Sequence, residues 1–176
     1  MRLPWVRDQP PEAALAALSA QAKGERVVSW ADTASGSVIL ATPRGLWWPS
    51  DDTHRLIGWQ YISKAVWRDD VLSVIQADVL DDLILDRPPV AERLVVPRDL
   101  PPTVHKRVSL NVAHTELVRV SGGSVRFVGR HLPGEDRVAW WARLEPGTPA
   151  SDDVLDAVRA RLRLLEQRWH SGAGRG

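Results

Sequence analysis

Short polar turns separate the apolar segments along most of this chain, and they constrain the fold more than any other feature. Pro43-Arg44-Gly45, Arg68-Asp69-Asp70 and Gly122-Gly123 each join two apolar segments directly. Glycine supplies the positive φ angle that such turns need, and aspartate is favoured there for local hydrogen bonding. Parallel strands need long crossover connections, so these turns exclude a parallel, doubly wound sheet. The sequence therefore predicts antiparallel strands.

The strands are indicated by alternation of apolar residues or by short β-branched runs. They are expected at 26–30, 37–42, 46–48, about 55–67, 71–78, 117–120, 125–128 and 138–144. Between residues 79 and 100, prolines separate two short apolar runs, 83–85 and 94–96. Because proline is confined to the edges and bulges of sheets, this stretch predicts edge strands or loops.

Three helices are expected around these strands. Pro10-Pro11 and Glu12 favour a helix over about 11–22, and a four-residue spacing of valines predicts another over about 101–111. Ser151 and the acidic residues after it indicate the start of the last helix. Its apolar stripe consists of Val154, Val158, Leu162, Leu165 and Trp169. We expect a tail and short helix over 1–24, one domain over 25–170 and a disordered tail over 171–176.

This order predicts an α+β domain with N-terminal, inserted and C-terminal helices around an antiparallel bent sheet or partly open barrel. The order resembles the pleckstrin-homology-like architecture, in which a C-terminal helix closes a bent barrel; the helix at 101–111 is an insertion to that pattern. Pleckstrin-like lipid readers carry basic residues around the first hairpin. Here residues 31–37 include Asp32 and neither Lys nor Arg, which disfavours phosphoinositide binding.

The C-terminal third carries a second resemblance. The run Val125-Arg126-Phe127-Val128-Gly129-Arg130-His131-Leu132-Pro133-Gly134 is followed by Trp140, by Leu144-Glu145-Pro146-Gly147 and by the helix after Asp152-Asp153. This pattern is similar to a family of uncharacterised actinobacterial proteins. The resemblance extends over 25–169 and agrees with a composition in which only three of 23 basic residues are Lys. It implies an origin and no activity.

Composition excludes several classes of protein. The 176 residues include no Cys, so the chain has no disulfide, no thiolate nucleophile and no Cys-ligated metal. A formal net charge of +1 gives no strong field for nucleic acid or an acidic membrane. The N-terminus lacks a signal-peptide pattern, and no apolar run is long enough to span a bilayer. We expect a cytoplasmic protein without a membrane partner.

No catalytic signature is present. Gly-x-Ser-x-Gly, a Walker loop and His-Glu-x-x-His are all absent, and the histidines have no metal-ligand spacing. The four doublets Asp51-Asp52, Asp69-Asp70, Asp81-Asp82 and Asp152-Asp153 fall in turns or at a helix start, where aspartate makes local hydrogen bonds. The sequence therefore predicts no cofactor, no metal and no catalytic residue, and it favours a protein that is not an enzyme.

One group of residues suggests binding. Strand alternation places Arg126 and Arg130 on one face of a strand, and Arg137, Trp141 and Arg143 on one face of the next. If the two faces coincide, four guanidinium groups surround an exposed indole, a combination suited to a protein interface or to stacking on a base. The alternative is a solvated sheet face with Trp141 buried beneath the last helix or a neighbouring subunit.

Three functions follow. The first is a non-enzymatic binding or scaffolding domain that contacts a protein partner or a second copy of itself. The second is a nucleic-acid or nucleotide binder that uses the Arg/Trp face. The third is a small hydrolase with a non-standard site, which requires a deep pocket with clustered His54, His114 or Asp side chains.

The aromatic residues are unusual, because nine of eleven are Trp. Trp30, Trp59, Trp67, Trp140 and Trp169 fall on apolar stripes and are expected in the core. Trp47 and Trp48 are adjacent on one strand, so one of them should point outward, and Trp141 stands in the same relation to Trp140. Trp5 precedes the first helix and is not assigned.

Overall fold

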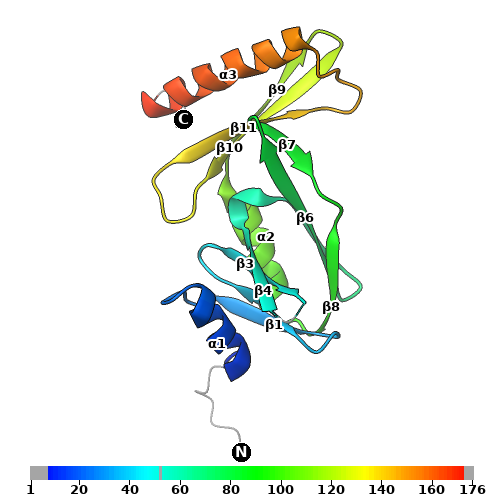
Figure 1. Cartoon of the computed structure of the whole chain (residues 1–176), viewed down its shortest axis with the longest axis vertical. Coiled ribbons are helices and arrows are strands. Elements are labelled where there is room, and N and C mark those ends of the chain that lie inside the picture. Colours follow the sequence, from blue (N-terminus) through cyan, green and yellow to red (C-terminus); the bar gives the residue numbers. More distant parts are fainter. Residues whose placement is uncertain (1–7, 52, 173–176) are drawn as a thin grey trace, which may run out of the picture.

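The computed structural model describes residues 8–51 and 53–172. Within these residues the chain forms three α-helices, a short 3-10 helix and eleven strands (Figure 1). Trp5, Asp52 and residues 173–176 of the expected disordered tail lie outside them. The helices are α1 (Glu12–Gln21), α2 (Leu100–Asn111) and α3 (Asp152–His170), close to the three predicted ranges.

The strands form one large sheet that does not close on itself. They are β1 (Ser29–Thr33), β2 (Val38–Ala41), β3 (Gly45–Ser50), β4 (Thr53–Gly58), β5 (Ile62–Arg68), β6 (Val71–Leu80), β7 (Leu83–Asp86), β8 (Val90–Val96), β9 (Val112–Val120), β10 (Gly123–His131) and β11 (Val138–Leu144). Their order is β4-β3-β2-β1-β8-β6-β7-β11-β10-β9, with β5 also paired to β6. All pairs are antiparallel except β7 with β11. The prediction of an α+β fold with an antiparallel sheet and three helices in these places is confirmed.

The first strands are buried on both faces, which the sequence did not reveal. Trp47 packs with Trp30 and Leu18 beneath α1, whereas Trp48 faces a separate core that includes Leu100 of α2. Both indoles of β3 are therefore buried, and the prediction that one points outward is wrong. The prediction failed because α1 covers the face of β3 that carries Trp47, whereas α2 and other strands cover the face that carries Trp48.

The predicted long strand over 55–67 is wrong, because the chain breaks at Trp59–Tyr61. These residues form the 3-10 helix η1 between β4, which pairs with β3, and β5, which pairs with β6. Trp59 is anchored in the core, where its indole Nε1 donates to the backbone oxygen of Thr42 at 2.9 Å. The break lets consecutive strands join different parts of the sheet.

The stretch expected as edge strands or loops is interior to the sheet. β8 lies between β1 and β6, and β7 lies between β6 and β11. Pro88, Pro89 and Pro97 flank β8 instead of interrupting it, so no ladder hydrogen bond is lost.

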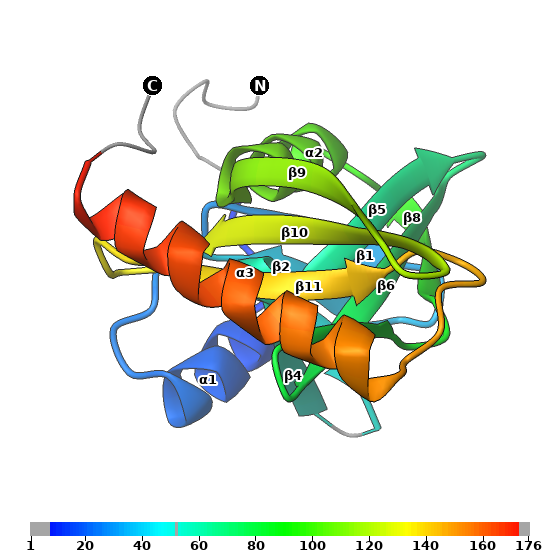
Figure 2. The same ribbon diagram turned by 90° about the horizontal axis from the view of Figure 1, so that it is seen from above.

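Helix α3 covers one face of the last three strands (Figure 2). Val154, Val158, Leu162 and Leu165 are buried against Phe127 and its neighbours, which confirms the predicted stripe. Trp140 is buried in the same cluster and makes an edge contact with Trp169, with ring centroids 5.8 Å apart. The ion pair of Arg161 with Glu116, closed at 2.8 Å, joins α3 to β9.

Two of the four aspartate doublets form the turns between strands. Asp69 and Asp70 connect β5 to β6 with φ angles of 50° and 63°, and Asp81 and Asp82 connect β6 to β7 with 47° and 66°. Two consecutive positive φ angles in a two-residue loop are typical of a type I′ turn. The conformation accounts for these two doublets without acid–base chemistry.

Replacing Asp70 by glycine is expected to raise the free energy of unfolding by about 0.5–1 kcal/mol. The left-handed conformation costs an L-residue about 1–2 kcal/mol, and glycine removes this cost. Glycine also has more freedom in the unfolded chain, which offsets about half of the stabilisation. Urea unfolding measures the difference. Ser73→Gly, inside β6, is the matched control and should lower stability; a loss in both variants would contradict the turn assignment.

Candidate functional site

The predicted Arg/Trp face is formed by β10 and β11. In their register Arg126 is opposite Arg143, Val128 is opposite Trp141, and Arg130 is opposite Ala139. Residues directly opposite each other project from the same face, so the expected coincidence of the two faces occurs. Arg137 is one residue before β11 and belongs to the connecting turn.

Trp141 is buried and not exposed as predicted. Only 8% of its surface is accessible, and it packs with Ala77 and Ile84. The ring of Tyr61 stacks on the indole, with centroids 5.5 Å apart and planes 18° apart. The cover therefore comes from η1 and from β6 and β7, whereas α3 lies on the opposite face of β11.

Three of the four guanidinium groups are held by carboxylates of this chain. Arg126 pairs with Glu145 at 2.8 Å, and Arg137 pairs with Glu135 in its own turn. Arg143 is held by both oxygens of Asp86, and its Nη2 also donates to Ser63 at 2.9 Å. The hydrogen bond from Arg143 holds the pKa of Asp86 below its usual value, which keeps the pair ionised.

Arg130 is the exception. It is 7% exposed, and its Nη1 has no hydrogen-bond partner among the described residues. Burial lowers the pKa of its guanidinium, the nearby charge of Arg143 lowers it further, and Asp86 partly compensates. One arginine of this face is buried and the other three are paired with carboxylates of the chain. The face therefore offers few free guanidinium groups to a base or a phosphate.

The histidines do not converge in a pocket. The ring of His54 hydrogen-bonds to the backbone oxygen of Val38, His114 lies beside Trp140, and His170 bonds to the helix backbone at Glu166. Among the described residues no group of three His, Asp or Glu side chains could hold a metal ion. His54 and His114, which the hydrolase hypothesis would bring together in a pocket, thus make separate contacts.

Two depressions flank α2 instead. The first, which we call the β5–α2 groove, has a volume of about 470 Å³. It is lined by Ala65, Trp67, Leu72, Pro101, Pro102, Val104 and His105. Trp67 is 48% exposed, so its predicted place in the core is wrong. Every lining side chain except His105 is apolar.

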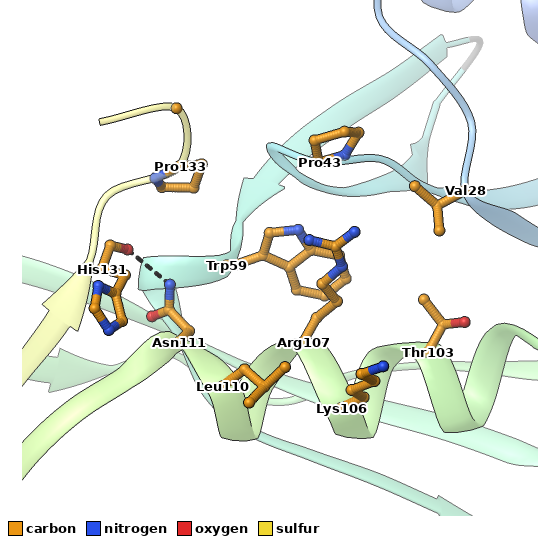
Figure 3. A pocket seen from close by; sticks show the side chains of 11 residues that line it. Val28, Pro43, Trp59, Thr103, Lys106, Arg107, Leu110, Asn111, His131 and Pro133 are labelled. Carbon is orange, nitrogen blue, oxygen red and sulfur yellow. Dashed lines mark hydrogen bonds between the residues drawn. The ribbon is translucent and has the colours of Figure 1, made fainter. Parts of the chain in front are cut away.

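The second depression, which we call the basic pocket, lies on the other flank of α2 and measures about 620 Å³. Figure 3 shows Thr103, Lys106, Arg107 and Asn111 along α2, with Pro43 and Val28 opposite. The remaining lining residues are Trp59, Leu110, His131, Pro133 and Gly134. No carboxylate lines the pocket, and no described carboxylate lies within ion-pair distance of Lys106 or Arg107.

Asn111 gives the basic pocket a fixed polar group. Its Nδ2 donates to the backbone oxygen of His131 at 2.7 Å, drawn as the dashed line in Figure 3. The residue is 7% exposed, and its Oδ1 has no hydrogen-bond donor among the described residues. A buried acceptor without a donor is costly, and because the oxygen itself is buried, it does not face the pocket.

The sequence did not single out either depression. Thr103, Arg107 and Asn111 recur every four residues in a predicted helix, which indicates one helix face, but only the fold shows that this face borders a pocket. None of the described helices has the length and apolar character needed to cross a membrane. No protein-family model, no curated protein and no solved structure matches this chain.

Proposed function

We propose that this protein is a non-enzymatic binding domain that takes an extended segment of a partner protein in the β5–α2 groove. The observation that supports this proposal is Trp67, which is about half exposed in an apolar groove. The groove borders an edge of β5 that pairs with no other strand of the described part of the chain. Tryptophan is strongly enriched among the residues that dominate the energy of protein interfaces.

The backbone of β5 offers hydrogen-bonding groups to such a segment. Within residues 8–51 and 53–172, β6 is the single strand that pairs with β5. In a hairpin with a two-residue turn, the pair that flanks the turn, here Arg68 and Val71, exchanges backbone hydrogen bonds. Along the two strands, hydrogen-bonded pairs then alternate with pairs that are not hydrogen-bonded to each other. The N–H and C=O groups of Trp67 and Ala65 are therefore directed to the outer edge. An added strand would bond to these groups.

The side chains of the same residues line the groove. Ala65 and Trp67 are two apart on β5 and share a face, and Pro101 and Pro102 stand opposite them at the start of α2. An extended segment that bonds to the edge would place alternate side chains against these apolar groups. This combination favours a protein partner over nucleic acid, because the groove offers no permanent cation for a phosphate.

The proposal is tested with a phage-displayed library of random peptides selected on the full chain. We expect enriched peptides to share alternating apolar residues and to lose at least about tenfold in affinity for Trp67→Ala, as is typical of a hot-spot residue. Ala65→Pro should also weaken binding, because it removes an outward N–H without touching a bond to β6. Fluorescence anisotropy of a labelled peptide measures both effects.

Leu164→Ala is the matched control. Leu164 is 46% exposed on α3, away from the groove, and its truncation should leave peptide binding unchanged. Peptides that bind Trp67→Ala and wild type equally would contradict the proposal. Size-exclusion chromatography with light scattering tests whether a second copy of this chain occupies the groove. A dimer that Ala65→Pro dissociates would show that the occupant is a second copy and not a different protein.

A further inference from the structure

We propose that the partner segment in the β5–α2 groove alternates apolar with acidic residues, with its apolar side chains in the groove and its carboxylates on the opposite face of the sheet. This inference rests on the proposed function, because it names the chemistry of the segment that the groove takes. It depends on residues that do not line the groove, so the two can be tested separately.

The two faces of β5 differ in chemistry. Ala65 and Trp67 line the groove, so Lys64, Val66 and Arg68, which alternate with them, project from the opposite face. The last three side chains are all exposed. An added strand alternates in the same way, so its side chains are divided between the groove and the face that carries these exposed residues.

The strand register extends this face across β6 and β8. Arg68 is opposite Val71, and Val71 is in turn opposite Arg93. We call the surface the outer face, and its residues are Lys64, Val66, Arg68, Val71, Ser73, Ile75, Ala91 and Arg93. These eight residues include three cations and no carboxylate. The outer face is therefore positively charged, whereas the groove on the other side of β5 is apolar.

The positive charge of the outer face is not neutralised by ion pairs. Within residues 8–51 and 53–172, no carboxylate lies within ion-pair distance of Lys64, Arg68 or Arg93. Arg93 donates to the backbone oxygen of Asp69 at 3.1 Å, which is a bond to an uncharged peptide group. Asp69 and Asp70 belong to the turn beyond Arg68, and neither forms an ion pair there.

A strand that pairs with β5 brings its own side chains next to these cations. Partner residues opposite Ala65 and Trp67 share the groove face, and those opposite Lys64 and Arg68 lie on the outer face. A partner residue opposite Val66 is diagonal to both cations, within reach of a long side chain. Opposite charges in such positions attract and like charges repel, each typically by about 1.5- to 5-fold in affinity. Acidic residues are therefore favoured at alternate positions of the segment.

Three labelled peptides of about eight residues test the inference on the full chain by fluorescence anisotropy at low ionic strength. In each peptide Val alternates with a second residue, which is Glu, Ser or Lys. We expect the Glu peptide to bind about tenfold more tightly than the Ser peptide, and the Lys peptide to bind most weakly. The preference for Glu should decrease as salt is added, because exposed ion pairs are screened.

The double variant Lys64→Gln/Arg68→Gln should bind the Glu and Ser peptides equally, and its affinity for the Ser peptide should equal that of the wild type. Lys23→Gln/Arg163→Gln is the matched control, because it removes the same two charges from exposed positions outside the outer face. It should keep the preference for Glu. Trp67→Ala should weaken all three peptides by a similar factor, since their Val residues share the groove. Thermal unfolding verifies that each variant retains its fold.

Equal affinity for the three peptides, each lowered by Trp67→Ala, would overturn this inference and leave the proposed function in place. If none of the three binds, the inference is wrong, and the proposed function is judged by the peptides selected from the random library. A preference for Glu that persists in Lys64→Gln/Arg68→Gln would show that other charges produce it, and this too would overturn the inference. Binding of the Glu peptide that Trp67→Ala leaves unchanged would contradict both proposals.

Discussion

Replacing Trp141 by alanine is expected to lower the free energy of unfolding by about 3–5 kcal/mol, the usual cost of truncating a buried tryptophan. The indole lies between Tyr61 on one side and the small cluster of Ala77 and Ile84, and little of it is accessible. Its removal leaves a cavity and exposes the apolar surface by which β11 contacts β6 and β7. Small domains are stable by about 5–15 kcal/mol, so this loss is a large part of the total.

Urea unfolding followed by circular dichroism measures the effect. Trp141→Phe keeps an aromatic ring beneath Tyr61 and should cost less than half as much. Trp67→Ala removes the same side chain from an exposed position and should change stability by less than about 1 kcal/mol. If Trp141→Ala left stability unchanged, Trp141 would not be a core residue, and the interpretation of an exposed Arg/Trp binding face would return.

The fold was predictable where the signal is local. Type I′ turns at Asp69-Asp70 and Asp81-Asp82 are properties of a few consecutive residues, as are glycines at the ends of strands. These local signals predicted the antiparallel connections correctly. α3 was equally clear, because acidic residues at its start and an apolar stripe of four turns agree with each other. Local rules that point to the same element leave few alternatives.

The errors arise where a distant segment decides which face is covered. Alternation shows that Trp47 and Trp48 lie on opposite faces of β3, but not that α1 covers one of them. In the same way, Trp141 is covered by Tyr61, which is 80 residues earlier in the chain. The sequence places a side chain on a face, and only the assembled sheet determines whether that face meets solvent.

The same reason applies to the candidate sites. The Arg/Trp face has the residues of a binding surface, yet Glu145 and Asp86 neutralise two of its arginines from other parts of the chain. Trp67 was predicted in the core because it shares a face of β5 with Ala65. Ala65 packs against the core, but Trp67 lies farther along the strand and lines the groove beside α2. The arginines of this face were visible in the sequence, but the sequence did not show which of them pair with a carboxylate.

Arg130 is a buried cation with no ion pair to a described carboxylate. Arg130→Met is expected to raise the free energy of unfolding by about 1–3 kcal/mol. Replacing a buried charge by an apolar side chain of similar length is often stabilising, because the cost of removing the charge from water disappears. Here the cost is high, since Nη1 has no partner and the neighbouring Arg143 carries the same charge. Methionine retains the unbranched stem that packs against the sheet.

Arg143→Met is the matched control, because it makes the same change on the same face with the opposite expected sign. It removes the partner of Asp86 and the donor to Ser63, and it should lower stability by about 1–2 kcal/mol, a value reduced by the partial exposure of the pair. Urea unfolding of both variants at pH 7 compares them directly. A loss in Arg130→Met as large as that in Arg143→Met would show that the buried guanidinium stabilises the fold. Opposite signs would show that the chain neutralises one arginine of this face and tolerates the other at a cost in stability.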